Sequence, residues 1–92
     1  MKDKLTFTLF TPRQKLEPME CDSVRLPVAD SVSGKFSGSY GIRKGHAKAI
    51  LALDAGKISV SNAGDEIYSA ECDSGFAVVE NNDVRVTVDS VK

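Results

Sequence analysis

The chain has 92 residues and a formal net charge of -1, with 41% hydrophobic and 27% charged residues, which is typical of one small globular domain spanning residues 1–92. The balanced charge disfavours non-specific nucleic-acid binding, because such binding requires a basic surface that displaces counterions from phosphates. The sequence contains no run close to the ~20 apolar residues of a membrane span, and the N-terminal MKDKLTFTLF lacks the apolar core of a signal peptide, so we expect a cytoplasmic chain without membrane insertion.

Alternation of apolar and polar residues is the dominant pattern along the chain and predicts half-buried β-strands. In LTFTLFT, residues 5–11, positions 5, 7 and 9 are apolar and share one face. Ala49, Leu51 and Leu53 also alternate, in a stretch too short to predict a long helix. KISVSN at 57–62 and DVRVTVDSV at 83–91 repeat the pattern, which predicts strands that bury one face and present the other to water or to a partner.

Turn signals separate these strands. TPRQ, DAGK, NAGD, DSG and NND combine Pro, which presets φ, with Gly and Asn, which accept positive φ. Signals that recur about every eight to twelve residues predict an all-β sandwich or barrel. The Gly/Ser-rich SVSGKFSGSYG at 31–41 is the one stretch that we expect to form a mobile loop.

SGKFSGS at 33–39 invites comparison with a phosphate-binding loop but lacks its signature. The signature needs a glycine five residues before the Gly-Lys pair, where Ala29 stands, and Ser or Thr after the lysine, where Phe36 stands. An all-β chain also lacks the helix N-terminus that such a loop feeds. We therefore expect a plain surface loop, and no nucleotide or other cofactor.

Cys21, Cys72 and His46 are the residues best suited to metal binding or nucleophilic catalysis. No two of them lie within about two to four residues of each other, so they match no metal-ligand pattern. A Cys–His nucleophilic pair would require hydrogen-bond reach between the side chains, which the sequence leaves open. We predict free thiols in a cytoplasmic chain, no metal site and no catalytic residue, with a small thiol enzyme as an alternative.

The stretch YGIRKGHAKAILALDAGKISV at 40–60 carries a Gly-rich loop with two adjacent cations and the only histidine, followed by an apolar segment. It resembles the Leu-Gly-Ile-x-Pro-Gly-His-Ala pattern of the N-terminal domain of the epsilon subunit of rotary F-type ATP synthase, which is called delta in mitochondria. The matching positions are Gly41, Ile42, Gly45, His46 and Ala47.

The resemblance extends along nearly the whole chain through the order and spacing of further segments. LTFTLFTPRQKL resembles the first strand and turn of that family, CDSVRLPVAD its Val-x-x-Val-x-Val-Pro segment, and DSGFAVVENNDVRVTVDS its final hairpin. The resemblance implies a flattened antiparallel β-sandwich of about ten short strands.

The resemblance also implies a function without chemistry of its own. It implies a subunit of the central stalk that binds the gamma subunit, rests on the polar loops of the c-subunit ring and couples proton translocation to ATP synthesis. The chain would then be peripheral to the inner face of the cell membrane, held there through the complex. The expected ring-facing residues are Tyr40, Ile42, Arg43, Lys44 and His46. The expected gamma-facing residues are Thr11, Ile50 and Leu51, on a face that should expose an apolar patch in the isolated chain.

The sequence departs from the family pattern at several positions. Ser39 stands where the family usually has an acidic residue, Tyr40 replaces the leucine and Lys44 replaces the loop proline. These departures predict a ring contact that differs in sign or strength. Family members usually continue into two C-terminal helices that restrain ATP hydrolysis, and a chain that stops at Lys92 is expected to lack that inhibition. A non-catalytic β-sandwich interaction module of another assembly is the alternative interpretation.

Overall fold

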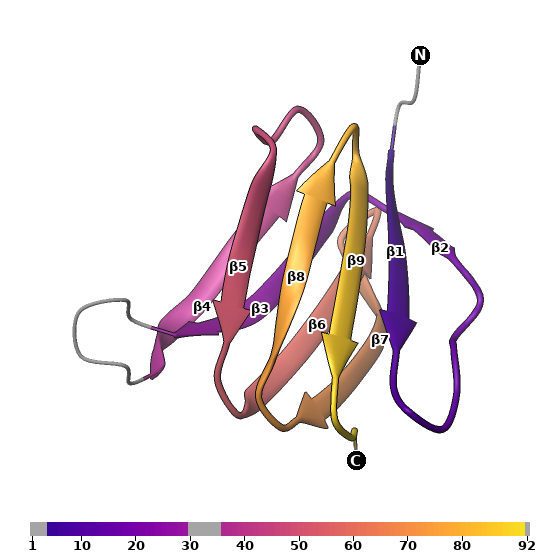
Figure 1. The fold of residues 1–92 in the computed structure, drawn as a ribbon. Coiled ribbons are helices and arrows are strands. Elements are labelled where there is room, and N and C mark those ends of the chain that lie inside the picture. The colour runs from indigo at the N-terminus through magenta and orange to yellow at the C-terminus, as the bar shows by residue number, and fades with distance from the viewer. Residues whose placement is uncertain (1–3, 30–35, 92) are drawn as a thin grey trace.

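A computed structural model describes residues 4–29 and 36–91, and within them the chain forms nine strands and no helix (Figure 1). No helix in this described part is long and apolar enough to cross a membrane. The all-β prediction is thus confirmed. The strands are β1 (Leu5–Phe10), β2 (Met19–Cys21), β3 (Ser23–Ala29), β4 (Phe36–Arg43), β5 (Ala49–Leu53), β6 (Gly56–Asn62), β7 (Asp65–Cys72), β8 (Gly75–Glu80) and β9 (Asp83–Val88).

The strands form two layers that face each other, as in a β-sandwich (Figure 1). The first layer has the order β2-β1-β9-β8-β5, and the second consists of β3, β6 and β7 with β4 on the other side of β3. A single pair of residues, Val28 and Leu53, joins β3 to β5 and so connects the layers at one edge. The sandwich is therefore one sheet that curls over itself.

One strand pair departs from the expected antiparallel arrangement. The first strand β1 runs parallel to the last strand β9, with Phe7 opposite Val84 and Leu9 opposite Val86. All the other strand pairs among the described residues are antiparallel. The first and the last described strands are therefore joined by backbone hydrogen bonds within the first layer.

The hydrophobic core lies between the layers and contains the residues whose alternation marked them as inward-facing. The Phe7 ring of the first layer lies 6.1 Å from the Tyr68 ring of the second, centroid to centroid, and so packs across the sandwich. The buried cluster comprises Leu5, Phe7, Leu9, Cys21, Val24, Leu26, Ile42, Leu53, Ile58, Val60, Cys72, Ala77, Val79, Val84, Val86 and Val88.

Two hairpin turns have the backbone shape that their sequences predict. Ala63 and Gly64, with φ of 55° and 84°, connect β6 to β7, and Asn81 and Asn82, with φ of 52° and 62°, connect β8 to β9. Positive φ at both central residues is the mark of a type I′ turn, whose twist matches that of the flanking strands. These turns fix the register of both hairpins.

The prediction of a mobile loop over residues 31–41 is partly wrong. Residues 30–35 lie outside the described part of the chain. Residues 36–41, however, belong to β4, where Gly41 pairs with Arg25 of β3. Tertiary pairing overrides the weak β-propensity of glycine and serine there.

Candidate protein-interaction surface

The loop from Arg43 to Lys48 connects β4 to β5 at one end of the sandwich. Gly45 has a φ of 84°, a conformation that favours glycine, and the His46 amide donates to the Arg43 carbonyl oxygen at 3.2 Å. The Gly45 amide donates to the Asn82 side-chain oxygen at 2.8 Å, which ties the loop to the β8–β9 turn. The loop is therefore held by neighbouring structure and presents its exposed side chains from a fixed frame.

The single histidine, His46, also helps to hold the conformation of this loop. His46 Nδ1 lies 2.6 Å from the Ala47 carbonyl oxygen, which can only accept, so this nitrogen carries the proton. In the neutral ring Nε2 is then an acceptor, and the Tyr40 hydroxyl lies 2.6 Å from it. The two rings meet edge-on at a centroid distance of 5.6 Å. Both ring nitrogens are thus engaged in contacts that brace the loop.

The expected ring-facing residues do not all lie on the surface. Arg43 and Lys44 are exposed, Tyr40 is 37% exposed and His46 is half-buried. Ile42 is fully buried, because its pairing with Val24 turns its side chain toward the core. Ile42 therefore supports the loop from beneath, and its side chain is not available to a partner.

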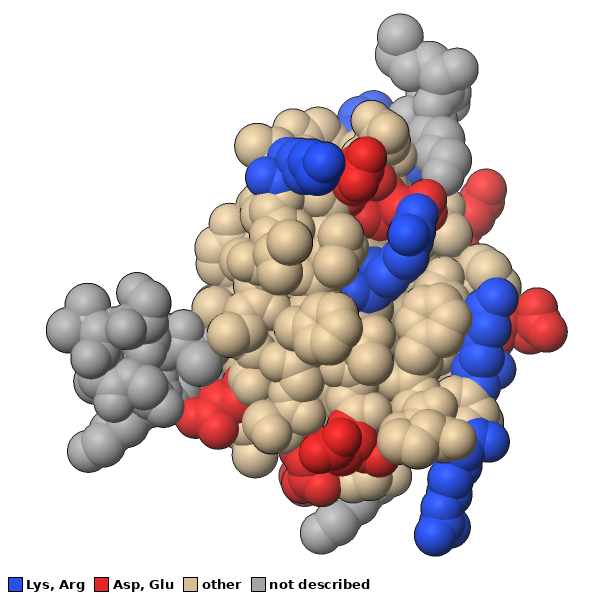
Figure 2. Space-filling model, in the orientation of Figure 1, with Lys and Arg blue, Asp and Glu red and all other residues tan. Residues whose placement is uncertain are grey.

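Much of the outer face of the first layer, over β5 and β8, is free of charged side chains (Figure 2), and large apolar side chains are exposed there. Ile50 is 75% exposed and Phe76 48% exposed. Ile50 lies opposite Val78, and Ala52 lies opposite Phe76, so the four side chains are neighbours on one face. We call Ile50, Ala52, Phe76 and Val78 the outer apolar patch. Exposed apolar surface of this kind is typical of a face that another protein covers.

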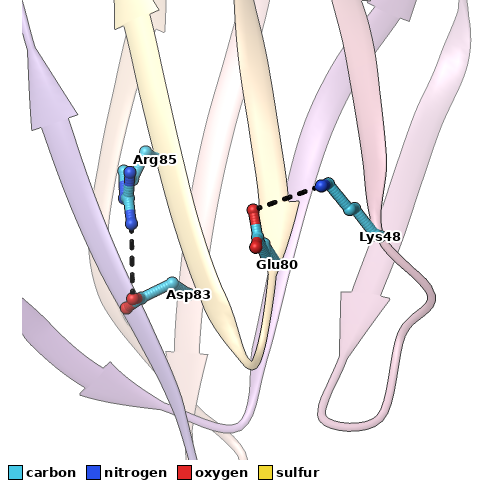
Figure 3. A network of polar contacts seen from close by, with 4 residues as sticks. All are labelled: Lys48, Glu80, Asp83 and Arg85. Carbon is cyan, nitrogen blue, oxygen red and sulfur yellow. Dashed lines mark ion pairs between the residues drawn. The ribbon is translucent and has the colours of Figure 1, made fainter.

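Ion pairs border this patch at the loop end (Figure 3). Lys48 Nζ lies 3.8 Å from a Glu80 carboxylate oxygen, and an Arg85 guanidinium nitrogen lies 3.8 Å from an Asp83 carboxylate oxygen. All four side chains remain partly exposed, so each pair contributes little to stability. In each pair the two charges balance, so the border of the outer apolar patch carries no excess charge at these residues.

The expected gamma-facing residues are placed differently from one another. Ile50 belongs to the outer apolar patch, as a gamma contact would require. Leu51 points inward and packs against the core. Thr11 lies at the far end of β1, where its hydroxyl oxygen accepts the amide of Gln14 at 3.1 Å. Sequence reasoning missed Phe76, although GFAVVE is apolar on both faces, a pattern that indicates a strand covered on both sides.

The thiols do not form a nucleophilic site. Cys21 and Cys72 are free and buried, and burial raises both pKa values, that of Cys21 to about 11. A nucleophilic cysteine needs the opposite shift, since the thiolate is the reactive form. The hydrogen bonds of His46 go to Tyr40 and Ala47, and the Cys21 thiol instead contacts the Leu5 carbonyl oxygen at 3.8 Å. No cluster of possible metal ligands occurs among the described residues.

The sequence over residues 4–92 matches the family described as ATP synthase, Delta/Epsilon chain, beta-sandwich domain. The chain belongs to this family. Curated relatives include ATP synthase epsilon chains of Prochloron didemni, 31% identical over 88 residues, and Synechococcus sp. (strain CC9311), 33% identical over 88 residues. Both alignments cover 96% of this chain and 59% of the relative. The family member described here thus spans well under two thirds of the length of these relatives.

Solved structures show the same fold. One is the mitochondrial ATP synthase of Euglena gracilis, with F1 and the c-ring, whose matching chain has a TM-score of 0.83 and 17% identity. That match covers 100% of this chain and 54% of the other. Another is the central stalk and c-ring of the Tetrahymena thermophila mitochondrial ATP synthase, with a TM-score of 0.74 and 14% identity over 99% of this chain and 67% of the other. At such identities the likeness establishes the β-sandwich fold.

Proposed function

We propose that this chain is the β-sandwich part of an epsilon-type central-stalk subunit of a rotary F-type ATP synthase. The family match over residues 4–92 is the observation that carries the proposal. The chain would sit at the inner face of the cell membrane as part of the complex and help to couple proton translocation to ATP synthesis. Its part in that coupling is mechanical, and catalysis takes place elsewhere in the complex.

The outer apolar patch is the surface that binds the gamma subunit in this proposal. Its four side chains come from adjacent strands of a hydrogen-bonded layer, so their relative positions are fixed before binding. A preorganised apolar surface loses little conformational entropy when a partner covers it. The flanking pairs of Lys48 with Glu80 and of Arg85 with Asp83 then form a polar rim, as in known interfaces.

The β4–β5 loop is the contact with the c-subunit ring. Tyr40, Arg43, Lys44 and His46 supply its accessible side chains. The bond from Gly45 to Asn82 passes force from the loop into β8 and β9. A close-packed sandwich then transmits that force with little deformation, because protein interiors have low compressibility.

Gel filtration with the cognate gamma subunit tests the proposal most directly. A single peak containing both chains at micromolar concentration is expected. Two separate peaks would contradict it.

A second measurement tests the ring contact in the reconstituted synthase. Charge reversal of Arg43 and Lys44 should reduce ATP-driven proton pumping while the isolated domain keeps its melting temperature. Lys57→Glu is the matched control, because Lys57 lies on β6, away from the loop. Equal pumping by the loop variant and the wild type would exclude the loop as a coupling contact.

A further inference from the structure

The cationic side chains of the strands and of the β4–β5 loop differ in whether a carboxylate lies within ion-pair distance. On the outer face of the first layer, Lys48 and Arg85 each lie within ion-pair distance of an acidic residue (Figure 3). On β6, Lys57 Nζ lies 3.4 Å from a Glu66 carboxylate oxygen. In these three cases the chain supplies its own counter-charge, so no partner is needed to balance them.

Arg25, Arg43 and Lys44 differ from those residues. All three are exposed, and none has a carboxylate within 4.0 Å in the described part of the chain. Arg25 is opposite Gly41, and Arg43 is opposite Ser23, so both arginines occupy outward positions on the paired strands β3 and β4. The register of this pair therefore places the two arginines at diagonal positions on one face.

Two adjoining hollows bring these cations together with a fourth. A hollow of about 330 Å³ is lined by Lys4, Asp22, Arg43 and Lys44. A second, of about 450 Å³, is lined by Asp22, Ser23, Arg25, Arg43, Ser61 and Gly64. The two share Asp22 and Arg43, and we call them together the cationic recess.

Cationic side chains predominate in the described lining of the cationic recess. Among the described residues, four cationic side chains line it against one carboxylate, that of Asp22. One oxygen of that carboxylate already accepts the Ala63 amide at 2.8 Å, and Lys4 Nζ donates to the Asn62 side-chain oxygen at 2.6 Å. The β6–β7 turn thus fixes the position of these two groups, while neither arginine side chain has a hydrogen-bond acceptor among the described residues.

We propose that the cationic recess binds carboxylate side chains of an acidic protein segment, on the surface that meets this end of the sandwich. The assignment rests on the proposed function, in which that surface is a polar loop of the c-subunit ring. Two guanidinium forks match carboxylates, each of which accepts two parallel hydrogen bonds. The Asp22 charge in the same recess disfavours a doubly charged phosphate more than singly charged carboxylates. Separate carboxylates, one over each arginine, suit the recess best.

Titration of the isotope-labelled 92-residue chain with hexaglutamate, followed by amide chemical shifts, tests the assignment. The amides of residues 22–25 and 43–45 should shift in a saturable manner, and the shifts should shrink as salt is raised. Arg25→Gln and Arg43→Gln should each weaken the apparent affinity about threefold, and together about tenfold, as expected for exposed ion pairs. Lys48→Gln is the matched control at the same end and should leave the affinity unchanged.

Inorganic phosphate and phosphatidylglycerol vesicles are parallel arms of the same titration. Tighter binding of either than of hexaglutamate would overturn the proposal in favour of a phosphate or a membrane ligand. Absence of saturable shifts at millimolar peptide would overturn it, as would equal effects of Lys48→Gln and Arg43→Gln. The double arginine variant should still co-elute with the gamma subunit. A wild-type chain that binds gamma but shows no saturable peptide binding refutes only the recess. Failure of the wild-type chain to bind gamma refutes the proposed function itself.

Discussion

Replacement of Ile50 by threonine should separate binding from folding. Threonine keeps the β-branched shape that strands favour, so the main change is lost apolar surface. Complete burial of an isoleucine side chain contributes about 1.5–3 kcal/mol. Because Ile50 is 75% exposed, a partner that covers it gains about three quarters of this, or about 1–2 kcal/mol. The Kd for the gamma subunit should rise roughly 5- to 30-fold.

The same exposure predicts a small effect on folding. The quarter of Ile50 that is already buried contributes about 0.5 kcal/mol to the free energy of unfolding. By contrast, Ile42→Ala should cost about 2–5 kcal/mol, because Ile42 is fully buried. Urea unfolding followed by circular dichroism measures both values.

Ile67→Thr is the matched control for the binding measurement. Ile67 is 46% exposed but lies on β7 in the second layer, away from the outer apolar patch. Calorimetric titration with gamma should give the wild-type Kd for this variant. A Kd for Ile50→Thr equal to that of the control would refute the assignment of the patch, and a large loss of folding stability would refute the exposure on which the magnitude rests.

Three further predictions concern stability and reactivity. Gly75→Ala should lower the free energy of unfolding by about 1–3 kcal/mol, because a Cβ at Gly75 would meet the Thr87 carbonyl oxygen. Thermal melting measures this effect, and an unchanged melting temperature would contradict it. At pH 8, Cys21 should react with a disulfide reagent far more slowly than a free thiol, and its reaction rate should increase as the pH approaches its pKa of about 11. Fast labelling of the folded chain at neutral pH would contradict this, because it would show an exposed thiolate. The hydrogen bond from Ser59 lowers the pKa of Glu66. The ionised Glu66 side chain therefore contributes to stability above the unfolded pKa of 4.5, and this contribution is lost as the pH falls through the lower folded pKa. Glu66→Gln should flatten the pH dependence of the melting temperature in that acidic window, and an unchanged profile would argue against the bond.

The sequence predicted the strands that bury one face and expose the other. In β6 and β9 the alternation of apolar and polar residues reports directly on burial, whereas in β1 the polar Thr8 is buried as well; each of these strands lies where the pattern indicated. β4 was missed in part because its glycine and serine residues carry no alternation. It forms a strand because β3 offers a hydrogen-bonding edge, which local sequence does not encode.

The candidate site was harder to predict than the fold because it depends on register. The orientation of Ile42 follows from its pairing with Val24, and the neighbouring positions of Ile50 and Val78 follow from the pairing of β5 with β8. A shift of one residue in either register would exchange inward and outward side chains. The cationic recess likewise exists because β3 and β4 pair so that Arg25 and Arg43 share a face.

The parallel pairing of β1 with β9 has a consequence for how the protein is made. β9 is the central strand of the first layer, between β1 and β8, yet it is the last of the nine described strands to be synthesised. Until then β1 and β2 form an isolated ribbon with an apolar face exposed to water, and isolated two-stranded ribbons are marginally stable. Assembly of the first layer therefore waits for the synthesis of β9, and the nascent chain passes through an aggregation-prone interval in which chaperone binding to β1 is expected.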